Sequence, residues 1–170
     1  MPDGRASPVA ARAPGPTACT GSTSLPLHAT MGTMPTGGAR QEETVARILL
    51  AEDDEEMRSL LAACLEASGH DVDQVADGTA LLDSFEALRT GEAAAPPDLV
   101  VTDIQMPGCN GLGAVAQLRQ WNDALAVIVI TAFGDARVHE RAGELGVERV
   151  LDKPFDLGDF MAAVENALGH

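Results

Sequence analysis

The sequence contains no tyrosine, only three cysteines and a single lysine in 170 residues. Cys19, Cys64 and Cys109 are an odd number of cysteines, and they lie far apart without a CxxC or histidine partner pattern. These features indicate neither a disulfide framework nor a zinc site, and they fit a reducing compartment. The N-terminus lacks the apolar core of a signal peptide, and no apolar run approaches the roughly 18 residues that cross a bilayer. We therefore expect a cytoplasmic protein.

Basic residues are also scarce. The chain has 11 basic residues against 26 acidic ones, and its formal net charge is -15. Residues 1–46 contain three residues of each sign, so the negative charge belongs to residues 47–170. An acidic domain repels the phosphate backbone of nucleic acids and anionic lipid headgroups alike. We therefore expect no direct binding to nucleic acid or to membranes.

The composition of the chain changes near residue 46. Residues 1–46 are rich in proline, glycine, alanine, serine and threonine, and they show no sustained apolar period. Such a segment cannot bury enough apolar surface to offset the entropy lost on folding, so we predict a disordered low-complexity tail. Residues 47–170 are long enough and hydrophobic enough for a single domain with one core.

Short apolar segments alternate with helical patterns from residue 47 onward. The predicted strands are residues 47–51, 72–76, 98–102, 125–131 and 148–152. Three of them are apolar on both faces, which is typical of parallel strands covered on both sides. Apolar residues at helical spacing follow the first and the last strand, and Gly69 ends the first helical pattern. The pattern predicts an α/β domain with a five-stranded parallel sheet and helices on both faces.

Polar residues gather where the predicted strands end. They are Glu52, Asp53, Asp54, Asp103, Thr131 and Lys153. Because ligands of such sheets bind at the carboxyl ends of the strands, we expect one site there. Clustered carboxylates repel one another unless a cation lies among them, and hard oxygen ligands suit Mg²⁺. A hydroxyl and an ammonium group could then orient a phosphoryl group for attack by a carboxylate, and Asp103, central in the sheet, is the candidate.

Four segments carry a resemblance to a known family. LLAEDDEEMR, VVTDIQMPGCNG, VIVITAFGD and VLDKPF resemble the four signature segments of the response-regulator receiver family, the CheY-like phosphoacceptor domains of two-component signalling. The similarity holds in order and spacing from Arg47 to Leu168. It implies a flavodoxin/CheY-like fold with strand order 2-1-3-4-5, a receiver domain over residues 47–170 and Mg²⁺ as the cofactor.

The resemblance also implies a role for each residue of the metal site. Asp103 is the implied phosphoacceptor and a metal ligand, Asp53 is a direct ligand, and Glu52 holds a metal-bound water. The main-chain carbonyl of Gln105 is the third protein ligand. An arginine usually lies five positions after the second acid in this family, and Arg58 therefore selects Glu52 and Asp53 as the acid pair. Asp54 is then one of the acids that favour the first turn of a helix.

Thr131 and Lys153 are implied to contact the phosphoryl oxygens, and Lys153 is expected to pair with Asp103 before phosphorylation. We interpret the lone lysine as a requirement for a compact ammonium group, because a planar guanidinium needs more room. Receivers commonly have tyrosine or phenylalanine three residues before this lysine, whereas this chain has Val150. We therefore expect phosphorylation to change mainly the loop after the fourth strand and the helix that begins near Ala136.

The implied function is that of a single-domain response regulator. It would take a phosphoryl group from a histidine kinase or a phosphotransfer protein, assist its own phosphorylation and dephosphorylation, and change its affinity for an unknown target protein. The chain ends about two residues after the last predicted helix, so we expect the signal to pass through a partner. We expect a monomer or a weak dimer.

Two other functions are compatible with some of these residues. Phosphohydrolases of the haloacid dehalogenase type also use aspartate, Mg²⁺, threonine and lysine. They usually place a second aspartate two residues after the nucleophile, on the first strand, whereas this chain has Gln105 on the third. A scaffold with a vestigial phosphorylation pocket is the other alternative, and the complete set of pocket residues argues against it.

Overall fold

A computed structural model describes residues 45–92 and 95–169 of the chain. The prediction of a disordered tail therefore concerns residues that lie outside the described part, except for Val45 and Ala46. Ala46 is buried, and its carbonyl accepts a hydrogen bond from the Asp71 N–H at 2.9 Å. Ordered pairing in the described domain thus begins at Ala46, one residue before the first strand.

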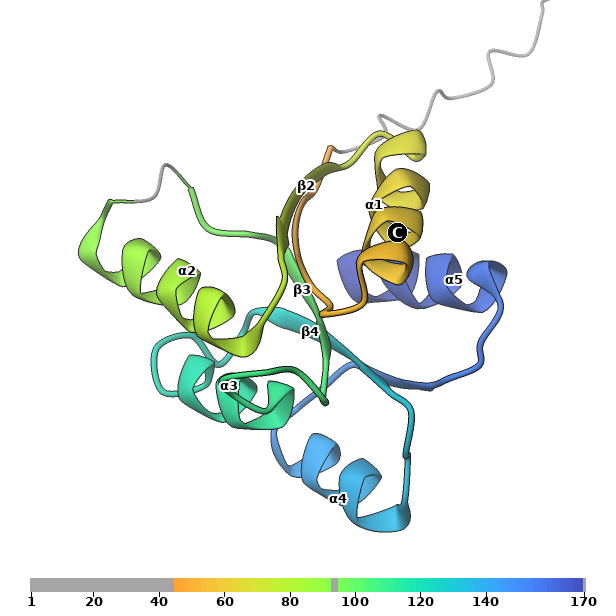
Figure 1. The fold of residues 1–170 in the computed structure, drawn as a ribbon. Coiled ribbons are helices and arrows are strands. Elements are labelled where there is room, and N and C mark those ends of the chain that lie inside the picture. Colours follow the sequence, from red (N-terminus) through yellow and green to blue (C-terminus); the bar gives the residue numbers. More distant parts are fainter. Residues whose placement is uncertain (1–44, 93–94, 170) are drawn as a thin grey trace, which may run out of the picture. The chain divides into compact units, whose positions relative to one another are not determined.

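Five parallel strands form one sheet (Figure 1). They are β1 (Arg47–Ala51), β2 (Asp71–Val75), β3 (Leu99–Asp103), β4 (Ala126–Thr131) and β5 (Arg149–Asp152). Their order is β2-β1-β3-β4-β5, and every neighbouring pair is parallel. The predicted fold class and strand order are confirmed, and each predicted strand boundary lies within one residue of the observed one.

Helices cover both faces of the sheet (Figure 1). They are α1 (Glu55–Ala67), α2 (Gly78–Thr90), α3 (Gly111–Leu118), α4 (Ala136–Glu144) and α5 (Leu157–Leu168). Apolar side chains of α1 and α5 pack on one face of the sheet, and those of α2, α3 and α4 pack on the other. The sheet is therefore the middle layer of three, as right-handed crossovers on both sides require.

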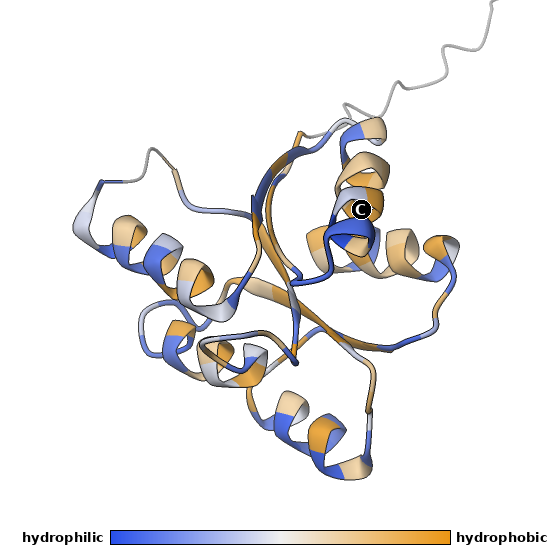
Figure 2. Cartoon of the chain, in the orientation of Figure 1, coloured by the Kyte–Doolittle hydropathy of each residue, from blue (hydrophilic) through white to orange (hydrophobic). Residues whose placement is uncertain are grey.

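The middle of the sheet is apolar because it lies between two helical layers (Figure 2). Every residue of β3 is buried, whereas the edge strand β2 has no buried residue. This difference explains why β3 reads as an almost continuous run of apolar residues in the sequence. No helix in the described ranges is both long and apolar enough to cross a membrane.

The first helix, α1, begins directly after Asp54. The Asp54 carboxylate accepts a hydrogen bond from the Met57 N–H at 2.8 Å and is the N-cap of α1. The predicted helix stop is also present, because Gly69 follows α1 with a φ of 88°. The turn between β1 and α1 is only three residues long, and it contains Glu52 and Asp53 as well as Asp54.

Candidate metal and phosphoacceptor site

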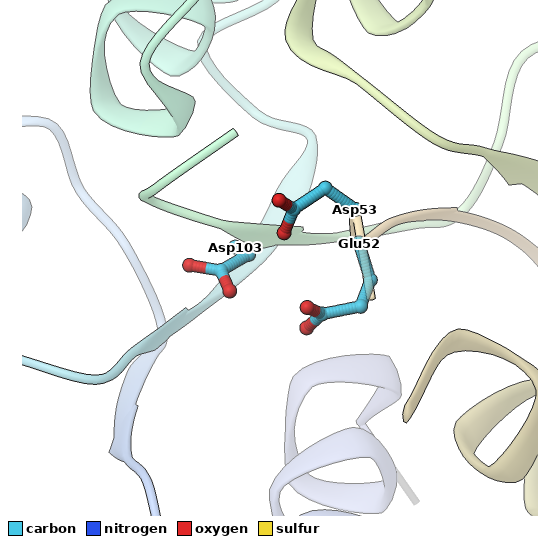
Figure 3. A group of neighbouring side chains, drawn as sticks. All are labelled: Glu52, Asp53 and Asp103. Carbon is cyan, nitrogen blue, oxygen red and sulfur yellow. The ribbon is translucent and has the colours of Figure 1, made fainter. Parts of the chain in front are cut away.

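Three carboxylates meet at the carboxyl ends of β1 and β3 (Figure 3). Glu52 and Asp53 follow β1 directly, and Asp103 is the last residue of β3. Each of the three offers one oxygen that lies within 4.8 Å of the others. Glu52 and Asp103 are buried, whereas Asp53 is exposed. Neighbouring strands thus bring together acids that are about fifty residues apart in the sequence, as the sheet topology predicted.

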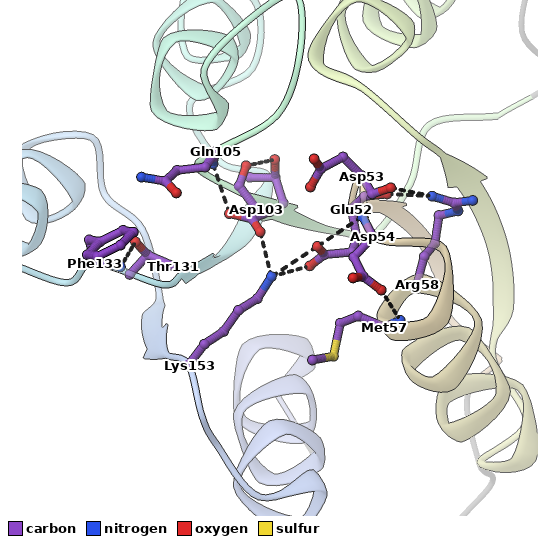
Figure 4. A network of polar contacts seen from close by, with 11 residues as sticks. Glu52, Asp53, Asp54, Met57, Arg58, Asp103, Gln105, Thr131, Phe133 and Lys153 are labelled. Atoms are coloured by element: carbon purple, nitrogen blue, oxygen red, sulfur yellow. Dashed lines mark hydrogen bonds and ion pairs between the residues drawn. The ribbon is translucent and has the colours of Figure 1, made fainter.

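Lys153 reaches this cluster from the loop after β5 (Figure 4). Its ammonium nitrogen lies 2.5 Å from Asp103 Oδ2, and the expected pairing with the unphosphorylated aspartate is confirmed. The same nitrogen donates to Glu52 Oε2 at 2.8 Å and to Oε1 at 3.0 Å. The sequence analysis did not predict this second partner. One lysine therefore neutralises charge on two buried carboxylates at once.

The local environment shifts the pKa of both Glu52 and Lys153. Burial raises the pKa of Glu52, and the Asp103 charge adds to this, while the hydrogen bond and charge of Lys153 oppose it. Burial alone would lower the pKa of Lys153, but its hydrogen bonds to Asp103 and Glu52 outweigh this and raise it. Lys153 therefore keeps its positive charge in the site at neutral pH.

Neighbouring residues hold the Asp103 side chain and its main-chain carbonyl in place. The Gln105 N–H donates to Asp103 Oδ1 at 2.9 Å, so the main chain of Gln105 lies beside the carboxylate. The Thr102 hydroxyl donates to the Asp103 carbonyl at 3.0 Å. Gly111, at the start of α3, packs so closely on this carbonyl that an added Cβ would lie 2.1 Å from its oxygen. The loop after β3 thus folds back tightly around the aspartate.

Thr131 ends β4 and is buried at the same edge of the sheet. Its hydroxyl accepts a hydrogen bond from the Phe133 N–H at 3.1 Å (Figure 4). Within residues 45–92 and 95–169, no hydrogen bond joins the Thr131 hydroxyl to the side chain of Asp103 or Lys153. The Lys153 N–H does donate to the Thr131 carbonyl, at 2.7 Å, and so ties the residue after β5 to the end of β4. The Phe133 side chain is 70% exposed. Val150 is half-buried on β5, where it pairs with Val129 of β4.

The turn after β1 separates the roles of its acids. The Asp54 side chain is the N-cap of α1 and accepts a hydrogen bond from the Met57 N–H. Arg58 donates to the main-chain carbonyl of Glu52 at 2.7 Å. These contacts leave Glu52 and Asp53 as the two acids that point toward Asp103, in agreement with the acid pair selected from the sequence.

The donor set of this cluster fits a magnesium ion. Three carboxylates provide hard oxygen ligands, and the exposed Asp53 leaves one side of the cluster open to water, which Mg²⁺ usually retains. Glu52, Asp53 and Asp103 are the residues that could hold the ion. When bound, the ion supplies positive charge that lets an anionic carboxylate approach an anionic phosphoryl group.

The comparison with known families agrees with the geometry. Residues 48–165 match the response regulator receiver domain. The chain belongs to this family. The receiver domain is a phosphoacceptor signalling domain of two-component systems rather than an enzyme that acts on a separate substrate. The acidic cluster of this chain is typical of the Mg²⁺ site of receiver domains.

Individual relatives show how far the receiver domain extends. The transcriptional regulatory protein FixJ of Azorhizobium caulinodans is 38% identical over 118 residues, which are 69% of this chain and 53% of FixJ. The non-phosphorylated HemR receiver domain from Leptospira biflexa is 29% identical, with a TM-score of 0.64 over 74% of this chain and 95% of that one.

The response regulator TrrA of Thermotoga maritima, solved in complex with Mg²⁺ and BeF, is 25% identical with a TM-score of 0.62; the similarity covers 72% of this chain and 99% of TrrA. This receiver chain spans only 24% to 56% of the length of the curated relatives that it matches. Functions that those relatives perform through the rest of their length are therefore not assigned to this chain.

Proposed function

We propose that Asp103 accepts a phosphoryl group in a Mg²⁺-dependent reaction and that phosphorylation changes the affinity of this domain for a partner protein. The donor is a phosphohistidine of a histidine kinase or a phosphotransfer protein. The observation that carries the proposal is the contact of Asp103 with Lys153 at 2.5 Å, beside two further carboxylates that could hold a cation. The cytoplasm remains the predicted compartment.

The proposed transfer uses the chain's own groups in defined roles. An Asp103 oxygen attacks phosphorus, the new P–O bond forms, and the P–N bond to the donor imidazole breaks with the electron pair leaving on nitrogen. Lys153 moves from the Asp103 carboxylate to a phosphoryl oxygen and stays positively charged throughout. The Thr131 hydroxyl donates to another phosphoryl oxygen, and its oxygen can still accept from the Phe133 N–H. The main-chain carbonyl of Gln105 completes the proposed metal ligands.

The domain is proposed to assist both its own phosphorylation and the later loss of phosphate. Small phosphodonors such as acetyl phosphate should therefore suffice without a kinase. Incubation with acetyl phosphate and Mg²⁺, followed by intact-mass spectrometry, should give one phosphoryl adduct that is lost in EDTA and in Asp103→Asn. Asp98→Asn makes the same chemical change at the residue before β3, away from the site, and should behave like the wild type.

The two alternatives predict different results in the same experiment. A scaffold with a vestigial pocket would give no adduct in the wild type. A phosphohydrolase would turn over phosphate monoesters continuously, but Gln105 stands where those enzymes usually have the second aspartate, and the chain belongs to the receiver family. An adduct that persists in Asp103→Asn would place the phosphoacceptor elsewhere and contradict the proposal.

A further inference from the structure

Arg58 makes an unusual contact for a basic residue beside three acids. Its Nη1 donates to the main-chain carbonyl of Glu52 at 2.7 Å and approaches the carbonyl of Asp53 at 3.5 Å (Figure 4). Among the described residues, Arg58 forms no ion pair with a carboxylate. Arg58 belongs to α1 and is half-buried. One guanidinium group thus binds the peptide groups of the two acids that could hold a metal ion.

The other hydrogen bonds of this turn hold N–H groups rather than the carbonyl of Glu52: the Asp54 N–H donates to Glu52 Oε1 at 3.4 Å. The Glu52 N–H donates to Val75 on β2 at 3.2 Å, and Asp54 caps α1 through its side chain. Among the described residues, Arg58 is the only group recorded as donating a hydrogen bond to the carbonyl of Glu52. The orientation of a peptide group sets the direction in which the neighbouring side chains leave the backbone. A group that holds these carbonyls can therefore restrain how Glu52 and Asp53 face Asp103.

The positive charge of Arg58 also lies close to the acidic residues of the site. Lys153 approaches the carboxylates from the β5 side, and Arg58 approaches the backbone of the acid pair from α1 (Figure 4). A guanidinium does not lose its proton in proteins, so this second cation is always present. Both carbonyl contacts come from Nη1, which carries two N–H donors. Arg58 thus lies at the backbone of the acid pair, whereas Lys153 lies among the carboxylates.

We propose that Arg58 is a positioning residue for the metal ligands: it touches neither the ion nor the phosphoryl group, and it tightens Mg²⁺ binding by fixing the backbone of Glu52 and Asp53. This inference rests on the proposed function, because it requires that these acids bind the ion. Outer groups that orient metal ligands typically contribute about 10-fold to 100-fold in metal affinity, which sets the size of the expected effect.

Isothermal titration of the full chain with Mg²⁺ tests the inference. Arg58→Met should weaken Mg²⁺ binding about 10-fold or more, and Arg58→Lys should fall between Arg58→Met and the wild type. Arg47→Met is the matched control. It removes an arginine from the other end of β1, where the side chain binds Asp73 and the carbonyl of Ala95 away from the site. It should change Mg²⁺ affinity by less than about twofold, because the removed charge is screened and distant.

A second readout separates positioning from general loosening of the fold. The melting temperature of each variant is measured in EDTA, where the metal cannot contribute. If Mg²⁺ affinity falls in Arg58→Met but not in an equally destabilised Arg47→Met, positioning is supported. If affinity follows the melting temperature in both variants, the inference is overturned. Should Arg58→Met fail to fold, Arg58→Lys decides, and wild-type affinity in that variant overturns the inference.

The same titration keeps this inference apart from the proposed function. Asp53→Asn should abolish or strongly weaken Mg²⁺ binding, because it neutralises a proposed direct ligand. If the wild type binds no Mg²⁺ at millimolar concentration, the proposed metal site fails and the inference fails with it. If the wild type binds, Asp53→Asn does not, and Arg58→Met binds as tightly as the wild type, only the role of Arg58 is refuted.

Discussion

Lys153 donates to both carboxylate oxygens of Glu52, at 2.8 and 3.0 Å, although the two residues are 101 positions apart. The Glu52 side chain is fully buried, so this contact compensates a charge that water cannot reach. The same ammonium also holds Asp103. Lys153 thus compensates two of the three carboxylates that could hold a cation.

Lys153→Met should lower the free energy of unfolding by about 3 kcal/mol in EDTA, because it leaves buried Glu52 without its cation. Urea denaturation measures this. Arg149→Met removes an exposed cation from β5, the strand that precedes Lys153, and should change stability by less than about 0.5 kcal/mol. Adding Glu52→Gln to Lys153→Met should restore much of the loss. Equal urea midpoints for Lys153→Met and the wild type would mean that the ion pair contributes no stability.

Lys153→Arg should keep the fold and some phosphorylation but weaken the conformational response, because a planar guanidinium needs more room between Asp103 and Glu52. Hydrogen exchange with and without beryllofluoride, a phosphoryl mimic, measures the response. In the wild type we expect the change mainly in residues 131–145, since Val150 supplies no aromatic ring.

Arg149→Lys is the matched control for this experiment, because it exchanges one cation for another at an exposed position of β5. It should respond like the wild type. A full response in Lys153→Arg would show that the lone lysine is an accident of composition. An unchanged exchange rate over residues 131–145 in the wild type would place the signal path elsewhere.

Gly111→Ala should displace the phosphoacceptor, because its Cβ would lie 2.1 Å from the Asp103 carbonyl oxygen. We expect a loss of about 2 kcal/mol in stability and at least about 10-fold slower phosphorylation by acetyl phosphate. Gly113 lies in the same helix, and a Cβ added there would meet only Cys109 Sγ, at 3.5 Å, so Gly113→Ala is the control. It should keep the wild-type rate. Equal rates in both variants would show that the loop after β3 adapts without moving Asp103.

Two truncations test where the folded domain begins. A chain starting at Val45 should fold and be phosphorylated at the wild-type rate, because residues 1–44 have no composition that builds a core. A chain starting at Arg47 loses the Ala46 carbonyl that binds the Asp71 N–H, and its stability should fall by about 1 kcal/mol. Thermal unfolding measures both. Loss of folding in the longer truncated chain would show that the preceding residues contribute to the domain.

Local pattern was sufficient for the fold and for the members of the site. The apolar character of β3 and β4 reflects burial on both faces, and a periodic stripe reflects a helix packed on one face, so both are visible in a short stretch of sequence. The signature segments placed Asp103, Lys153 and the acid pair at one edge, where the structure has them. The roles of Asp103, Lys153, the acid pair, Thr131 and Gln105 toward a phosphoryl group and a metal remain predictions.

Only the tertiary structure decided which groups satisfy one another at this edge. Glu52 follows β1 and Lys153 follows β5. Their pairing depends on the distance between the ends of these two strands, which no local sequence period encodes. The contact of Arg58 with main-chain carbonyls has the same origin, because every residue has a carbonyl and the sequence does not mark the one that is bound. Side-chain identity is local information, whereas the choice of partner depends on geometry that exists only after the strands and helices have packed.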